Sequence, residues 1–435
     1  MKKLLLILIV LLITVGCNKS DSEAEDSDRT STKELEGYWE GEIQVPNQPL
    51  NIQIEFHNGK EWTGMIEIPA QNVRNFTLSE IKTNGNDVSF RMPLAGQSIL
   101  FDGTIEGEEL KGTFTQNGQS FPFSLTKGEK VKEEEEGEFL SIETATGALY
   151  GELLMPQGEK VAPVALIIPG SGPTDRDGNS QGSPGKNDSL KLLAEELAAK
   201  GIATLRYDKR GAGRNADSVV AQEEMRFDVF IDDAKQWLEL LEADDRFTDI
   251  AVIGHSQGSL VGMMAAGPET TEAFISLAGA GQTIDQLLES QLKESLEGKW
   301  LEESQKILES LRDGETVTEV SQPLQSVFAP NVQPFLLSWM AYDPAEQLAD
   351  LEVPTLIING RHDLQVSAEE ARRLERAKPD AEVLLFDEMN HVLKEAPETR
   401  EENLATYSNP DLPLAQGLTD SIVDFLHRSG FSKQE

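Results

Sequence analysis

The chain has 435 residues, of which 38% are hydrophobic and 26% are charged. This composition is typical of globular proteins and excludes a collagen-like, a fully disordered or a polytopic membrane protein, while the length suggests two or three domains. The 76 acidic residues outnumber the 38 basic residues, and the formal net charge of −38 disfavours nucleic acid as a partner because phosphates are repelled. The single cysteine, Cys17, excludes an internal disulfide and a thiolate zinc site.

The N-terminus has the features of a targeting signal. Two lysines precede an apolar run over residues 4–15, which is too short to span a membrane. The run ends at Gly16 and Cys17, so residues 1–16 resemble a bacterial lipoprotein signal peptide. The resemblance implies that Cys17 carries lipid, palmitate included, and that the protein is extracytoplasmic and anchored to a bacterial membrane, with the outer membrane and the cell surface both open. The alternative is an ordinary secretory signal with a chance cysteine.

Two acidic segments of low apolar content divide the rest of the chain. Residues 17–36 are rich in Ser, Glu and Asp and predict a disordered tether. Residues 128–138 include a run of consecutive glutamates, and like charges extend a chain, so this segment is expected to be a linker. The tether and the linker enclose one predicted domain, and a second follows.

Residues 37–127 consist of short segments that alternate apolar and polar residues, as half-buried strands do. Asn-Gly pairs separate several of them and favour hairpin turns. With about eight candidate strands, the segment predicts a small all-β antiparallel barrel or sandwich. His57 is the only histidine here, so no metal site is expected. Ligand binding, shielding of an active site and spacing from a membrane all remain open as roles for this domain.

Residues 139–435 predict a domain of the α/β class. Apolar runs of strand length alternate with amphipathic helical segments, which indicates a mainly parallel sheet covered on both faces. The expected strands are 164–168, 202–207, 250–253, 274–277, 355–358 and 382–386, and the expected helices are 190–200, 227–241, 260–266 and 420–428.

A serine motif lies between one of these strands and the helix after it. The residues are Gly254-His255-Ser256-Gln257-Gly258. A nucleophile on such a sharp turn needs glycine neighbours because the backbone is strained and closely packed. The turn would lift the Ser256 hydroxyl above the sheet and aim the Gln257 N–H at a developing oxyanion. The alternative is a tight turn with an idle serine.

Serine needs a base, and a fold of this kind needs the chain order serine, acid, histidine. His391 is the candidate base because it follows a strand and comes after both Ser256 and a suitable acid. Asp363, after the preceding strand, is the candidate acid, and Asp387 and Glu388 are competitors. The other four histidines lie in the β-rich domain, inside the serine motif, beside the acid and in the last helix.

The glycine-rich segment after the first apolar strand is the expected source of the second oxyanion donor. Its sequence is Pro169-Gly170-Ser171-Gly172, and the backbone N–H of Ser171 is the first choice, with Gly172 next. Phosphate binding is disfavoured because the segment lacks the Lys-Ser/Thr of a P-loop.

Together these motifs resemble the α/β-hydrolase family, from about residue 139 to the C-terminus. The resemblance rests on the two motifs above and on Asp208-Lys209-Arg210-Gly211-Ala212-Gly213, Gly360-Arg361-His362-Asp363 and Asn390-His391. Residues 169–179 are similar to a bacterial carboxylesterase branch that also carries an N-terminal domain, and serine aminopeptidases and acyl-peptide hydrolases are related branches. The sequence departs from many relatives in having Pro169 where they have histidine.

Residues 282–350 form an insertion between two predicted sheet strands, with apolar residues near a helical period. The resemblance implies a helical lid that contacts substrate; the alternative is an insertion that packs only on itself.

The sequence therefore predicts a serine hydrolase, a carboxylesterase that acts on a small ester without cofactor or metal. A serine peptidase acting on short peptides is the first alternative. The second is a non-catalytic binding lipoprotein in which the β-rich domain is the working part. The oligomeric state is left open.

Overall fold

The computed structural model describes residues 34–46, 49–59, 61–71, 73–93, 99–116, 118–129, 137–180 and 185–431. The predicted signal peptide, Cys17, the tether before residue 34 and most of the linker lie outside the described residues. The described residues form two compact units, one of residues 34–129 together with Gly185 and one of residues 137–180 and 186–431.

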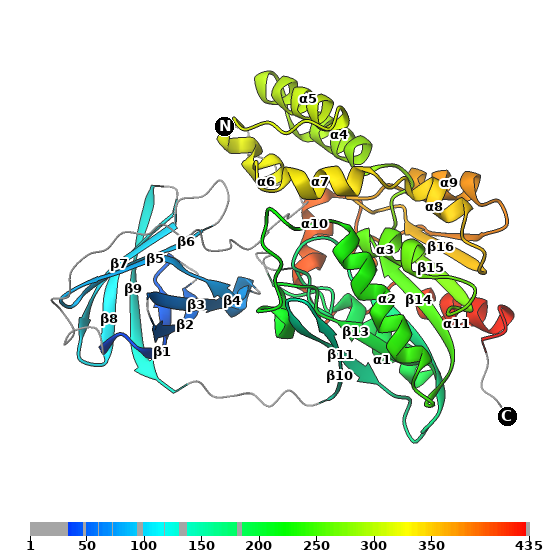
Figure 1. Ribbon diagram of the computed structural model, residues 1–435, viewed down its shortest axis with the longest axis horizontal. Coiled ribbons are helices and arrows are strands. Elements are labelled where there is room, and N and C mark those ends of the chain that lie inside the picture. The colour runs from blue at the N-terminus through cyan, green and yellow to red at the C-terminus, as the bar shows by residue number, and fades with distance from the viewer. Residues whose placement is uncertain are drawn as a thin grey trace. The chain divides into compact units, whose positions relative to one another are not determined.

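The first unit is a single antiparallel sheet (Figure 1), which among the described residues has nine strands in the order β4-β3-β2-β1-β9-β8-β7-β6-β5. The backbone N–H of Leu78, between β4 and β5, donates to the Gly64 carbonyl of β3 at 2.8 Å, so the two ends of the sheet approach and the barrel is nearly closed. The strands are β1 (Gly37–Ile43), β2 (Leu50–Asn58), β3 (Trp62–Ile68), β4 (Val73–Thr77), β5 (Ser79–Asn84), β6 (Asp87–Met92), β7 (Ile99–Glu106), β8 (Glu109–Gln116) and β9 (Gln119–Gly128).

Alternate residues of these strands point into one core. Phe90 and Phe101 stack at its centre with their ring centroids 4.7 Å apart, and Phe56 and Phe123 meet them edge to face. Such pairs add to the free energy of apolar burial. The buried Trp39 indole donates to the Leu35 carbonyl at 2.8 Å, so its polar edge is satisfied. The sequence predicted a barrel or a sandwich. The barrel is therefore confirmed, and the sandwich is wrong.

The second unit is built on a mixed, mostly parallel sheet (Figure 1), in the order β10-β11-β13-β12-β14-β15-β16-β17. The first two strands run antiparallel to their neighbours, and every pair from β13 to β17 is parallel. The strands are β10 (Glu138–Thr144), β11 (Gly147–Leu154), β12 (Ala162–Ile168), β13 (Ala203–Tyr207), β14 (Phe247–His255), β15 (Ala273–Leu277), β16 (Thr355–Gly360) and β17 (Glu382–Phe386).

Helices cover both faces of this sheet. Helices α1 (Ser189–Ala199) and α11 (Leu418–Arg428) share one apolar core with alternate residues of β12, β14 and β15. Helices α2 (Asp228–Glu242) and α3 (Gln257–Ala265) lie on the opposite face. The remaining helices after β16 are α9 (Ala368–Ala377) and α10 (Arg400–Ala405). The predicted fold class is thus confirmed.

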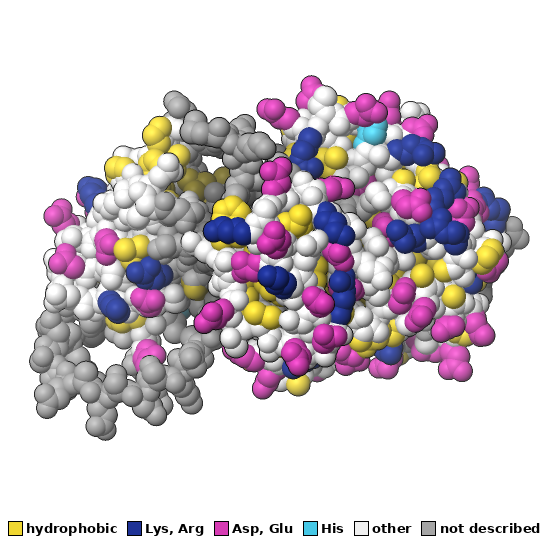
Figure 2. All heavy atoms as spheres, turned by 90° about the horizontal axis from the view of Figure 1, so that it is seen from above, with side chains coloured by type: hydrophobic (Ala, Val, Ile, Leu, Met, Phe, Trp, Pro, Cys, Tyr) yellow, Lys and Arg dark blue, Asp and Glu magenta, His cyan; other side chains and the backbone are white. Residues whose placement is uncertain are grey.

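The segment between β15 and β16 is helical, as its periodicity predicted. It contains α4 (Ile284–Ser295), α5 (Lys299–Arg312), α6 (Gln325–Phe328), α7 (Gln333–Met340) and α8 (Pro344–Ala349). None of the helices within the described residues is long and apolar enough to cross a bilayer. Figure 2 shows acidic side chains spread over the face in view, with Lys and Arg side chains among them.

Candidate active site

Ser256 sits on a strained turn between β14 and α3. Its φ of 54° and ψ of −120° are a conformation that costs a residue with a side chain about 1–3 kcal/mol. A Cβ on Gly258 would lie 2.7 Å from the Pro169 carbonyl oxygen, and a Cβ on Gly254 would lie 2.6 Å from the Gly258 carbonyl carbon. The two glycines are therefore needed for the close approach of strand, turn and helix that presents Ser256.

The candidate base and acid are bonded to each other. His391 Nδ1 and Asp363 Oδ2 are 2.8 Å apart, and both side chains are buried. The other carboxylate oxygen, Asp363 Oδ1, accepts the backbone N–H groups of Gln365 and Val366 at 2.7 and 2.8 Å. These bonds fix the direction of the Asp363 carboxylate, which in turn fixes the orientation of the imidazole.

The competing acids of the sequence prediction point elsewhere. Asp387 and Glu388 are both exposed, and Asp387 pairs with Arg361 at 2.9 Å. Of the three candidates, Asp363 is the one that the structure joins to His391.

His255 links the serine turn to the loop that carries His391. Its Nε2 and the His391 backbone oxygen are 2.8 Å apart, and the two ring centroids are 4.9 Å apart. Burial, and next the nearby His391, lower the pKa of His255 to about 4, so the ring is neutral at pH 7 and its Nε2–H donates to the carbonyl. Sequence reasoning assigned no role to this side chain, because the partner lies far along the chain.

The loop after β12 passes directly beside Ser256. A Cβ on Gly170 would lie 3.4 Å from the Ser256 Cβ. Ser171 lines the same pocket as Ser256 and Gln257. Its carbonyl accepts the Thr174 hydroxyl at 2.7 Å, which folds the loop back on itself. The loop thus brings Ser171 into the pocket that also contains Ser256.

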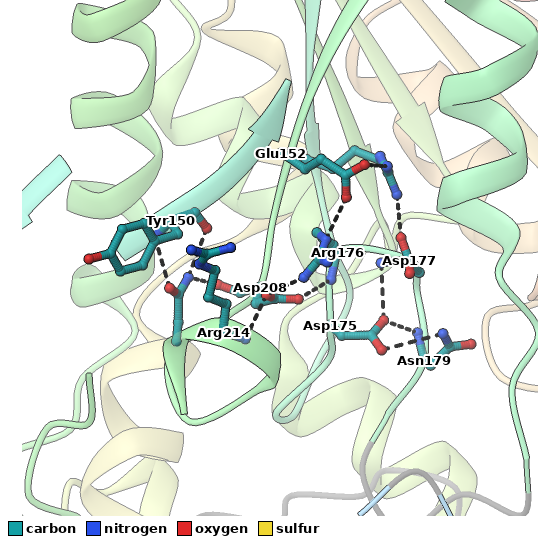
Figure 3. Close-up of polar contacts among 10 residues, drawn as sticks. Tyr150, Glu152, Asp175, Arg176, Asp177, Asn179, Asp208 and Arg214 are labelled. Atoms are coloured by element: carbon teal, nitrogen blue, oxygen red, sulfur yellow. Dashed lines mark hydrogen bonds and ion pairs between the residues drawn. The ribbon is translucent and has the colours of Figure 1, made fainter. Parts of the chain in front are cut away.

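Ion pairs hold Arg176 and Asp177 of this loop in place (Figure 3). Arg176 pairs with Asp208 at 2.8 Å and with Glu152 at 2.7 Å. Arg206, itself buried, pairs with Glu152 at 3.2 Å and also with Asp177. The ion pairs therefore tie residues of the loop to β11, to β13 and to the segment after β13.

Asp175 lies inside this network and has a perturbed carboxyl (Figure 3). Its Oδ1 accepts the backbone N–H groups of Asp177 and Asn179 at 3.0 and 2.8 Å. Burial, and then the negative charges of Asp177 and Asp208, raise its pKa from 3.8 to about 7. The folded protein thus binds more protons at this position than the unfolded chain does between about pH 4 and pH 7.

This proton uptake gives a prediction for Asp175→Asn. In the wild-type protein, the contribution of Asp175 to stability falls as pH rises through that window, and the variant lacks this term. We expect the variant to gain free energy of unfolding relative to wild type when denaturant titrations move from pH 4.5 to pH 7.5. Asp244→Asn is the control without a slope in this window, because bonding to Arg246 lowers the pKa of Asp244 from 3.8, so that this carboxyl is ionised in the folded protein throughout. Parallel stability curves for wild type and Asp175→Asn would contradict the assignment.

A pocket with about 540 Å³ of empty space, part of it open solvent, lies over Ser256. The helical insertion forms one side of it through Ile284, Leu287 and Gln291 of α4 and Trp339 of α7. Among its described lining residues there is no Asp, Glu, Lys or Arg. Apolar and uncharged polar groups therefore surround the space beside the serine.

No metal site accompanies this pocket in the part of the chain that the structure describes, where no group of three or more His, Cys, Asp or Glu side chains is arranged to hold an ion. His57 lies on β2 with its Nε2 3.6 Å from a carboxylate oxygen of Glu55, and its side chain is half exposed.

Comparison with known proteins agrees with this geometry. Residues 187–397 match a family model described as serine aminopeptidase, S33, and this range includes Ser256, Asp363 and His391. The C-terminal domain has the α/β-hydrolase fold, and the family match covers a little less than half of the chain. Esterase EstD of Thermotoga maritima is 27% identical to this chain over 261 residues. That match covers 59% of this chain and 60% of the relative, so the chain spans less than two thirds of that protein's length.

Solved structures similar to this α/β-hydrolase chain include several esterases. Est1E from Butyrivibrio proteoclasticus has 17% identity and a TM-score of 0.43, covering 66% of this chain and 99% of its own. The esterase domain of a Rhodothermus marinus protein has 16% identity and a TM-score of 0.41, covering 67% and 98%. The esterase PF2001 of Pyrococcus furiosus has 16% identity and a TM-score of 0.43, covering 70% and 95%.

Proposed function

We propose that the α/β-hydrolase domain is a serine hydrolase that cleaves carboxylic esters through Ser256, His391 and Asp363. The observation that carries the proposal is the position of Ser256, on a strained turn that opens into an uncharged pocket. The bonded pair of His391 and Asp363, tied to the same turn through His255, supports it. The match to a curated relative named an esterase agrees with this chemistry.

The residues define the steps of the reaction. His391 Nε2 takes the hydroxyl proton while Ser256 Oγ attacks the ester carbonyl, and Asp363 stabilises the imidazolium that forms. The backbone N–H groups of Gln257 and Ser171 hold the oxyanion of the tetrahedral intermediate. The intermediate collapses, the alcohol leaves with the proton from His391, and an acyl-enzyme remains. Water, deprotonated by His391, then adds to the acyl group; as this second intermediate collapses, His391 returns the proton to Ser256 Oγ, the acid is released and the free enzyme is restored.

A serine peptidase is the second candidate, because the matching family model is described as a serine aminopeptidase. An aminopeptidase has to bind the free α-amino group of its substrate, and buried or partly buried carboxylates serve that purpose best. The described lining of the pocket holds none, and its charge-free walls favour a neutral acyl group. This observation supports the ester reaction as the first candidate.

Parallel assays on the full-length protein in mild detergent separate the two candidates. One set is p-nitrophenyl esters from acetate to decanoate, and the other is aminoacyl p-nitroanilides. We expect turnover of the esters, with an optimum acyl length that reflects the space between Ser256, Leu287 and Trp339. A preference for the anilides would establish the peptidase instead. Turnover of neither would overturn the catalytic proposal.

The helical insertion is proposed to act as a lid over the acyl group. Its support is that α4 and α7 contribute lining residues to the pocket that holds Ser256, rather than packing only on each other. A buried acyl chain would then contact Leu287 and Trp339, which is the physical basis for a chain-length optimum.

We also propose that the protein is extracytoplasmic and anchored through lipid on Cys17. The support is the sequence of the first residues and the acidic spacer that follows. Metabolic labelling with an alkyne-tagged palmitate should label the wild-type protein in the membrane fraction, and Cys17→Ala should lose both the label and the membrane association. Equal labelling of the two proteins would contradict lipidation at Cys17.

A further inference from the structure

A buried lysine lies directly behind the proposed oxyanion site. Lys209 follows β13, and its side chain is almost fully removed from solvent. Its Nζ donates to the Gly170 carbonyl oxygen at 3.0 Å and to Gln257 Oε1 at 2.5 Å. It also lies 3.8 Å from the ring centroid of Phe230 on α2. Two hydrogen-bond acceptors and the negative face of an aromatic ring therefore surround the Lys209 ammonium group and suit a positive charge.

The first of these bonds acts on the peptide unit that carries an oxyanion donor. The Gly170 carbonyl and the Ser171 N–H belong to one trans peptide, so they point in opposite directions. A donor that fixes the Gly170 oxygen on one side therefore fixes the direction of the Ser171 N–H on the other. It also polarises the peptide and makes that N–H a stronger donor.

The second bond reaches the other proposed donor. Gln257 supplies its backbone N–H from the first residue of α3, and its side chain is held by the same ammonium group. Lys209 thus joins the loop after β12 to the start of α3, the two segments that must converge on one oxyanion.

We propose that Lys209 is a positioning residue of the oxyanion hole, whose ammonium group orients the Ser171 and Gln257 donors and strengthens them through its charge. The inference rests on the proposed esterase reaction. Lys209 does not touch the reacting atoms, so its effect is expected in the transition state, where the negative charge develops, and not in substrate binding.

Burial and a nearby carboxylate together set how much of Lys209 carries a charge near pH 7. Burial lowers the pKa of Lys209 to about 7, while the carboxylate of Asp233 opposes that shift. Asp233 is itself held by Arg210, which donates to its two oxygens at 2.6 and 2.7 Å. The hydrogen bonds of the Lys209 ammonium go instead to Gly170 and Gln257.

The test compares Lys209→Met with a matched buried lysine. Met keeps the length and apolar stem of the side chain and removes the donors and the charge. We expect kcat for a p-nitrophenyl ester to fall by about 10- to 100-fold with KM within about twofold, less than the loss of a direct oxyanion donor. Lys378→Met is the control, because Lys378 is also buried and its Nζ donates to a carbonyl, that of Leu351 at 2.9 Å. We expect that variant to keep the wild-type kcat.

A second readout separates positioning from a general structural role. A boronic acid that adds to the serine mimics the tetrahedral intermediate, so its affinity should fall in proportion to kcat/KM in Lys209→Met. Lys209→Gln retains N–H donors without charge and should recover part of the loss; it also replaces the Met variant if thermal melting shows that variant unfolded. Wild-type kcat in both Lys209 variants, or a rise in KM alone, would overturn the proposal. A wild-type protein without ester turnover would instead mark the failure of the proposed function.

Discussion

Replacing Ser256 by alanine is expected to lower kcat for a p-nitrophenyl ester by about 10⁶-fold, because the acyl-enzyme cannot form. The oxyanion donors remain, so a small rate above the uncatalysed reaction should persist. Steady-state hydrolysis, followed at the optimum acyl length, measures the effect. Far-ultraviolet circular dichroism and thermal melting of the variant should match wild type, since a single hydroxyl is removed.

Ser171→Ala is the matched control for this experiment. Ser171 lines the same pocket, but the account uses only its backbone N–H, which alanine retains. We therefore expect its kcat to stay within a few-fold of wild type. Activity that survives in Ser256→Ala and is lost in Ser171→Ala would move the nucleophile to Ser171 and contradict the account.

Replacing Asp363 by asparagine is expected to lower kcat by about 10⁴-fold with little change in KM. The reason lies in the two bonds at Asp363 Oδ1, which accepts the N–H groups of Gln365 and Val366. In the variant, the amide oxygen has to keep that place, so the NH₂ group faces His391 Nδ1. His391 then carries its proton on Nε2 and cannot accept the proton of Ser256. Ester kinetics across pH 6–9 measure the loss.

Asp387→Asn is the control for the acid. Asp387 was a sequence-level competitor, and it is exposed and bonded to Arg361. We expect its variant to keep kcat within about twofold, because a charge in bulk water has little effect on His391. A large loss of kcat in Asp387→Asn, with near-normal kcat in Asp363→Asn, would identify Asp387 as the acid and contradict the assignment of Asp363.

The fold of the second unit was predictable from the sequence because its strands are buried on both faces. Continuous apolar runs at 164–168 and 250–253 became β12 and β14, and the glycines of the serine motif became the tight turn at Ser256. The order of serine, acid and histidine along the chain then singled out Asp363 and His391, which the structure joins by a hydrogen bond.

The barrel was predicted less precisely, because glycines inside its strands resemble turn signals. The short alternating segments at 99–101 and 113–115 lie inside longer strands, because β7 extends to Glu106 and β8 runs from Glu109 to Gln116. Gly103 and Gly112 face each other across these strands, and a Cβ on Gly112 would collide with the backbone of β7. These glycines permit close strand contact, which single-sequence patterns do not distinguish from a loop.

The side chains that hold the candidate site together, His255 and Lys209, could not be inferred from local sequence patterns. His255 bonds to the backbone of His391, and Lys209 bonds to Gly170 and Gln257, all far apart in sequence. A buried lysine in particular has no local signature, because its burial is created by elements that assemble around it.

The most direct test of the central claim is to identify the residue that reacts with a fluorophosphonate. The full-length protein is treated with the probe, digested and mapped by mass spectrometry. The account predicts a single adduct on Ser256, lost in Ser256→Ala and formed much more slowly in Asp363→Asn. An adduct on another serine, or no adduct in a protein that still hydrolyses esters, would contradict it.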